Sequence, residues 1–191
     1  MFKRLFGRDR LANRAIVDSL YGQIVAAARQ PHLYSAWNVP DTPLGRFEMV
    51  ALHVYLFLHR ARGVTGPMAD IAQELTDEFF RDVEHSLREL GISDVGVPRR
   101  MKKLARMFYG RTVAYDAAVD GADRPELARA LARNVRPGPG DWPQAEALAF
   151  YVLAAVADLA GQDDAAICAG EMRFPAAART GGRDADDGRV A

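Results

Sequence analysis

The residues whose types and spacing best suit a functional role lie between 82 and 111, and the interaction they suit is electrostatic binding. Residues 99–111 hold six basic groups and no acidic one. A helix turns once in about 3.6 residues, so this stretch separates into two faces. The apolar face holds Met101, Leu104, Ala105, Phe108, Thr112 and Tyr115. The opposite face holds Arg99, Lys102, Lys103 and Arg106, with Arg100 and Arg111 on its flanks.

Clustered cations repel one another unless negative charge lies nearby. The preceding acidic stretch, residues 70–94, could supply that charge from within the protein and leave an ordinary solvated face. Nucleic acid, an anionic membrane surface or acidic groups of a protein client could supply it from outside. Met107 and Tyr109 lie off the apolar stripe, as adaptable binding residues often do. The sequence therefore predicts a partner-binding surface made of Arg99, Arg100, Lys102, Lys103, Arg106, Met107, Tyr109 and Arg111.

A carboxylate lies among the apolar positions of the preceding helix. Asp82 falls between the lines of Ile71 and Leu75. A carboxylate in such a position needs a partner. We expect Asp82 to form a structural ion pair with a basic residue of the 98–121 helix and so to fix how the two helices dock.

Catalytic and metal-binding patterns are missing from the sequence. Of the histidines His32, His53, His59 and His85, the middle two project about 120° apart on one helix and cannot chelate a metal together. No HExxH, glycine-rich phosphate loop or GxSxG motif occurs. We predict no catalytic, cofactor-binding or metal-binding residue, and no enzyme activity.

Charge and composition indicate the compartment. The net charge is zero, but it hides a basic N-terminal arm, residues 1–10, and the acidic and basic stretches already named. A single cysteine, Cys168, allows no intrachain disulfide and fits a reducing compartment. No secretory signal or membrane-spanning run is evident. We expect a cytoplasmic protein that can lie peripherally at the inner membrane.

Helix signals dominate the whole chain and strand signals are scarce. The expected helices cover residues 11–29, 44–62, 65–90, 98–121, 124–136 and 144–160. The second is apolar almost all round and should be central. Residues 31–43 read as a loop with exposed Tyr34 and Trp37. The sequence predicts an all-α, single-domain bundle of about six helices over residues 11–174, followed by a disordered tail over 175–191.

Two stretches resemble the ubiquinol–cytochrome c chaperone family, in a bacterial form. They are DTPLGRFEMVALHVYLFLHRAR at 41–62 and DVEHSLRELGISDVGVPRRMKKLARMFYGR at 82–111. The segment at 20–42 is also similar to the opening of that family. The resemblance implies a helical, non-enzymatic chaperone that receives newly made cytochrome b during assembly of respiratory complex III. It brings no catalytic residues.

Three functions stay open at this point. The first is the assembly chaperone, with newly made cytochrome b as client and the ribosome or an anionic membrane as further partners; DNA is not expected, and the need for a small protein partner is undecided. The second is a helical binder of, or enzyme acting on, an isoprenoid quinone or another apolar small molecule. That function requires a deep apolar pocket with Glu48, His59 or Asp82 pointing inward. The third is a general RNA-binding module.

Overall fold

The computed structural model describes residues 2–138 and 140–180, with side chains from residue 13 onward. Every regular element within these residues is a helix. Six are long: α1 (Phe2–Ala28), α3 (Pro43–Arg60), α4 (Pro67–Glu89), α5 (Gly96–Asp120), α6 (Arg124–Val135) and α7 (Ala145–Ala160). Three are short: α2 (Pro31–Ser35), α8 (Asp164–Cys168) and α9 (Ala177–Thr180). The predicted all-α architecture with about six long helices is confirmed for this part of the chain.

The helix ends follow local sequence signals. The hydroxyl of Thr42 accepts a hydrogen bond from the Gly45 amide at 3.1 Å, with Pro43 in the first turn of α3. The carboxylate of Asp123 caps α6 in the same way through the Glu126 amide, at 2.9 Å. Gly91 follows α4 with a φ of 76°. Capping side chains, N-terminal prolines and a left-handed C-terminal glycine are the residues that helix ends favour.

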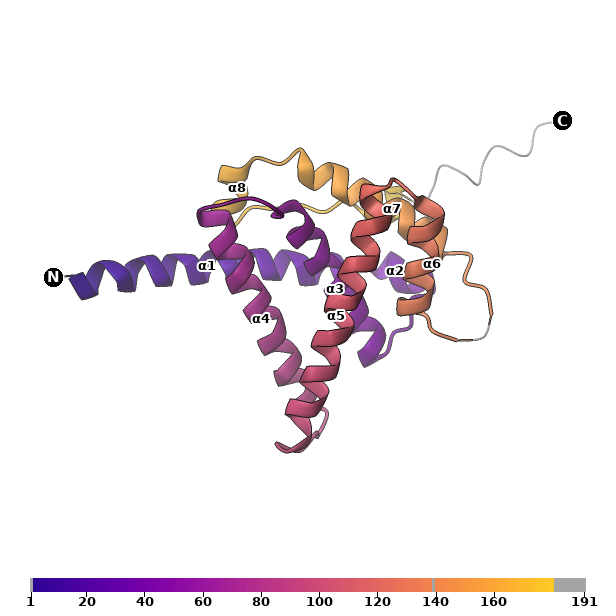
Figure 1. The fold of residues 1–191 in the computed structure, drawn as a ribbon, viewed down its shortest axis with the longest axis horizontal. Coiled ribbons are helices and arrows are strands. Elements are labelled where there is room, and N and C mark those ends of the chain that lie inside the picture. The colour runs from indigo at the N-terminus through magenta and orange to yellow at the C-terminus, as the bar shows by residue number, and fades with distance from the viewer. Residues whose placement is uncertain (1, 139, 181–191) are drawn as a thin grey trace.

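The core is built around α3, which packs against α1, α4, α5, α6 and α7 (Figure 1). Residues 51–57 of α3 are buried without interruption, as expected for a helix that is apolar on every side. Buried His53 donates from Nδ1 to the Met49 carbonyl and accepts at Nε2 from the Tyr151 hydroxyl, both at 2.8 Å. Burial lowers the pKa of His53 to about 4, so the ring is neutral at pH 7.

Two predicted loop or tail regions are more ordered than expected. Residues 31–35 form α2, and Trp37 is buried rather than exposed. The Trp37 carbonyl accepts a hydrogen bond from Nε1 of Trp142 at 2.8 Å. This pairing joins two loops that are far apart in sequence, so no local pattern around Trp37 announces it.

The predicted tail begins too early at residue 175. The Gln30 side chain accepts from the Ala177 amide at 2.8 Å and donates to the Pro175 carbonyl at 3.2 Å. Ala177 is fully buried. Residues 175–180 therefore belong to the folded body, and the rest of the predicted tail, 181–191, lies outside the described residues. The predicted N-terminal arm, 1–10, is helical from Phe2 onward as the start of α1.

Candidate functional site

The helices α4 and α5 form a hairpin whose connection lies at the lower end of the molecule, away from α6 and α7 (Figure 1). The turn after α4 is a Schellman motif. The Ile92 amide donates to the Leu87 carbonyl at 3.1 Å, and the Gly91 amide donates to the Arg88 carbonyl at 2.9 Å. The Val97 amide then donates to the Ser93 carbonyl at 3.0 Å as α5 begins. This closed turn fixes the direction in which the first half of α5 presents its side chains.

Five of the predicted partner-binding residues form one exposed surface on α5. This basic face consists of Arg99, Arg100, Lys102, Lys103 and Arg106. Among the side chains that the structure describes, none of the five has an acid within ion-pair distance. Within the described residues, this surface therefore carries positive charge that no ion pair compensates.

The neighbouring acids of α4 are held by other residues. Glu78 pairs with Arg14 of α1 at 2.8 Å and with Arg81. Arg88 holds Glu84 at 2.8 Å and also Asp94. Internal neutralisation by the acidic stretch, which the sequence left open, does not occur between described side chains.

Two of the predicted binding residues with apolar bodies lie beside the basic face. Tyr109 is 55% exposed, and its ring lies against Phe108 and Phe80 at centroid distances of 5.3 and 6.2 Å. Met107 is half-buried. One turn after Tyr109, Val113 is 71% exposed. The outer side of α5 thus changes from cationic to apolar along its length.

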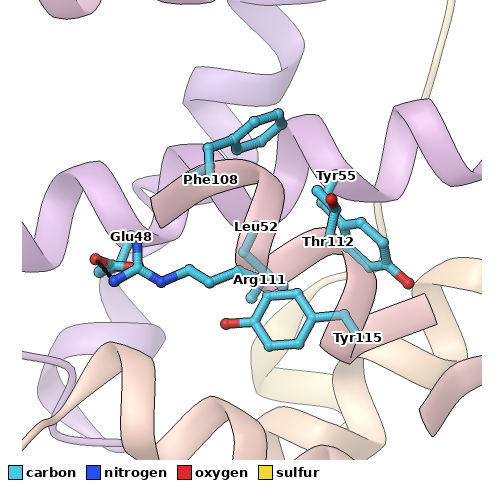
Figure 2. A pocket seen from close by; sticks show the side chains of 8 residues that line it. Glu48, Leu52, Tyr55, Phe108, Arg111, Thr112 and Tyr115 are labelled. Atoms are coloured by element: carbon cyan, nitrogen blue, oxygen red, sulfur yellow. Dashed lines mark ion pairs between the residues drawn. The ribbon is translucent and has the colours of Figure 1, made fainter. Parts of the chain in front are cut away.

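Arg111, also predicted to bind a partner, is not part of this surface. Its side chain is 12% exposed and turns inward to Glu48 of α3, with Nη2 at 2.8 Å from Oε1 (Figure 2). The prediction for Arg111 is wrong because α3 passes beneath this point of α5 and places a buried carboxylate there. Arg111 is a structural residue that joins α5 to the core.

The surroundings of the Glu48–Arg111 pair are closely packed. Burial raises the pKa of Glu48 to about 7, and the nearby guanidinium of Arg111 opposes part of that shift. Tyr55, Phe108, Thr112 and Tyr115 line the same gap (Figure 2). The gap has no room for a water-sized sphere. Glu48 therefore points inward, as a quinone site would require, but into a filled space.

Further polar pairs join α3 and the turn after it to the second half of α5. Nδ1 of His59 lies 2.8 Å from Oδ1 of Asp116. Arg62 donates two hydrogen bonds to Asp120, both at 2.8 Å. An open hollow of about 290 Å³ lies beside His59, between Leu56 and Val156. This hollow is open to solvent, unlike the enclosed apolar pockets that hold small ligands.

The prediction that Asp82 pairs with a basic residue of α5 is also wrong. Asp82 is exposed and accepts a hydrogen bond from the Tyr21 hydroxyl of α1 at 2.7 Å. No described basic side chain pairs with it. The prediction failed because α4 packs against both α1 and α5, and Asp82 lies on the side of α1. It helps to dock α1 on α4, and the α4–α5 contact relies on Phe79, Phe80 and Phe108 instead.

Sequence reasoning missed the Glu48–Arg111 pair. The available signal was an acid within a helix that is otherwise apolar on every side, because a buried carboxylate requires a partner.

In the described part of the chain, no group of three or more His, Cys, Asp or Glu side chains is arranged to hold a metal ion. None of the helices described there is long and apolar enough to cross a bilayer.

Comparisons with known proteins agree with this architecture. The chain matches the family model described as ubiquinol-cytochrome C chaperone over residues 35–174, which include the whole α4–α5 hairpin. It is also similar to the crystal structure of the Cbp3 homolog from Brucella abortus, with 52% sequence identity and a TM-score of 0.87. That match covers 94% of this chain and 99% of that chain. No curated protein matches. The chain belongs to the ubiquinol–cytochrome c chaperone family.

Proposed function

We propose that this protein is a non-catalytic assembly chaperone for ubiquinol–cytochrome c reductase and that newly made cytochrome b is its client. The family description and the likeness to a Cbp3 homolog support an assembly role. The resemblance of residues 41–62 and 82–111 supports the choice of client. We place the protein in the cytoplasm, peripheral at the inner membrane where a membrane-protein client is inserted.

One observation carries the proposal: the outer side of α5 combines uncompensated cations with exposed apolar side chains. Lys102, Arg106, Tyr109 and Val113 follow one another at helical spacing, and all four are exposed. A client segment that leaves the ribosome with apolar and acidic groups unpaired is matched by such a surface. The apolar residues would bury client surface, while the cations would speed the encounter and exclude basic segments.

The packing around Glu48 favours this function over binding a quinone. A quinone site needs an enclosed apolar space of at least about 300 Å³. The gap at Glu48 is filled, and the hollow at His59 is open. A chaperone requires a closely packed core and an exposed binding surface, here the cationic and apolar residues on the outer side of α5.

Site-specific photocrosslinking in the native, respiring host tests the proposal. A photoreactive residue is placed at Lys103, Met107 or Tyr109 in the full chain, and the captured proteins are identified. We expect cytochrome b to be captured from these positions and not from Arg136, an exposed cation at the end of α6. Equal capture from Arg136, or unchanged cytochrome b levels and quinol oxidation after deletion of the gene, would contradict the proposal.

A further inference from the structure

The tip of the α4–α5 hairpin, residues 90–96, exposes two aliphatic side chains. Val95 is 90% exposed and Leu90 is 57% exposed. The turn itself is well formed, because its amides bond to Leu87, Arg88 and Ser93. Ile92 folds back over the turn, so that a Cβ added at Gly96 would lie 3.1 Å from its Cγ2 atom. A closed turn therefore points Leu90 and Val95 outward.

Positive charge lies beside this apolar tip on its α5 side. Residues 90–106 contain the five cations of the basic face and one acid, Asp94, which Arg88 holds. On α4, Glu84 is also held by Arg88, and Glu89 lies 3.1 Å from Nε2 of His85. Arg99 and Arg100 follow Val95 by about one turn, so they form a basic collar within about 8 Å of it along the helix.

We infer that the hairpin tip binds the surface of an anionic lipid bilayer. Val95 and Leu90 enter the boundary between headgroups and acyl chains, and Arg99 and Arg100 contact lipid phosphates. Apolar side chains flanked by cations are the combination that holds peripheral proteins in this region. This inference rests on the peripheral membrane location in the proposed function and names the surface that makes the contact, but it does not depend on the identity of the client.

The tip suits lipid better than RNA or a protein. RNA rewards the cations, but its bases stack on aromatic or guanidinium planes and gain little from aliphatic side chains. A stable protein interface buries about 800 Å² on each partner, whereas the exposed large aliphatic side chains of the tip are only Leu90 and Val95 among the described residues. A bilayer needs only a few inserted side chains, and each cation near its surface strengthens binding about fivefold.

The hairpin would separate lipid binding from client binding. Val95 and Val113 are eighteen positions apart on one continuous helix, about 27 Å along its axis. With the tip in the bilayer, the Tyr109–Val113 end of the outer face lies toward the body of the protein and can receive a client. The two surfaces can therefore be tested one at a time.

Vesicle flotation of the purified full chain tests the inference. Vesicles contain phosphatidylcholine alone or equal parts of phosphatidylcholine and phosphatidylglycerol. We expect binding only to the anionic vesicles, weakened at least about tenfold by Val95→Asp and by the double change Arg99→Glu, Arg100→Glu. Arg136→Glu, a matched charge reversal far from the tip in sequence, and Val113→Asp should leave it unchanged.

A fluorescence probe at the tip gives an independent readout. The two native tryptophans, Trp37 and Trp142, are buried, so their emission is a constant background. Emission of Val95→Trp should shift to the blue on anionic vesicles, whereas emission of Val113→Trp should not. Because every substituted residue here is exposed, retained helicity by circular dichroism confirms that each variant folds.

Three outcomes would overturn the inference. Binding to neither vesicle would exclude a lipid surface, and anionic binding unaffected by the tip variants would place the lipid contact elsewhere. Binding to naked transfer RNA that is lost in Arg99→Glu, Arg100→Glu but retained in Val95→Asp, without vesicle binding, would assign the collar to RNA. None of these results bears on client capture, which is measured by crosslinking, so the proposed function can stand or fall by itself.

Discussion

The two halves of α5 both carry charged residues and use them differently. In residues 96–110 the cations face solvent without a described acidic partner. In residues 111–120 the charged side chains pair with α3 and the turn after it: Arg111 with Glu48, Asp116 with His59 and Asp120 with Arg62. The difference lies in what α5 packs against, because its second half is held along α3 and its first half extends beyond that helix beside α4. An arginine is structural or available for binding according to which helix lies beneath it.

The largest expected effect comes from breaking the inner half. Arg111→Ala removes the cation that compensates the buried carboxylate of Glu48, and loss of one partner of a buried pair costs about 3 kcal/mol of unfolding free energy. The loss should be greater at pH 8 than at pH 6, because Glu48 can take up a proton at the lower pH. Urea unfolding at both pH values measures this loss.

The matched change in the outer half is Arg106→Ala, at an exposed position. It should alter the unfolding free energy by no more than about 0.5 kcal/mol. Equal losses for the two variants would mean that the comparison between the halves is wrong.

The next largest effect is the loss of client binding when the charges of the outer half, residues 96–110, are reversed. Lys102→Glu combined with Lys103→Glu reverses the charge of the basic face, and we expect capture of cytochrome b from a probe at Tyr109 to fall about tenfold, equivalent to about 1.4 kcal/mol. The melting temperature should stay unchanged, because neither side chain has a described partner to lose. Full capture with reversed charge would show that the cations serve another ligand.

A smaller effect concerns the inner half of α5: the unfolding free energy should depend on pH through Glu48. The pKa of Glu48 is raised by burial to about 7, against about 4.3 for an unfolded chain. Between these values the native state binds more protons than the unfolded state, so stability falls as pH rises through 7. From pH 6 to pH 8 this group should cost about 1 kcal/mol of unfolding free energy.

The control for this pH effect is Glu48→Gln, which cannot titrate. The difference in unfolding free energy between the natural protein and this variant should change with pH by the stated amount. A difference that stays constant from pH 6 to pH 8 would mean that Glu48 is ionised throughout that range.

Much of the fold could be predicted because its signals are local. The bounds of α3 to α7 agree with the predicted ranges within two residues at each end, since capping residues such as Thr42 and Asp123 and the C-terminal Gly91 mark them. The missed features depend on distant partners. The buried Trp37 ring lies against Tyr151, and its carbonyl accepts a hydrogen bond from Trp142. Residues 175–180 are held by Gln30. None of these contacts leaves a pattern near its own residues.

The candidate site was predictable to the same degree. Helical period alone separated the exposed cations of residues 99–106 from the apolar stripe that ends at Tyr115. It could not assign Arg111, which lies on the flank between the two faces, because the neighbouring helix decides the direction of a flanking side chain. For the same reason Asp82 was given the wrong partner: the sequence showed that it needed one but not that α1 lies beside it.

The smallest effect concerns Gly110, which lies on the exposed side of α5 where the two halves meet. An added Cβ would find no atom within 4 Å, and glycine inside a helix is less stable than alanine by about 0.5–1 kcal/mol. Gly110→Ala should therefore raise the melting temperature by about 1–4 °C. Crosslinking from Tyr109 then decides whether the bare backbone is used: unchanged capture would mean that the client touches only the side chains around it. Reduced capture from this more stable variant would mean that a client segment packs directly on the helix backbone at the boundary between the binding half and the structural half.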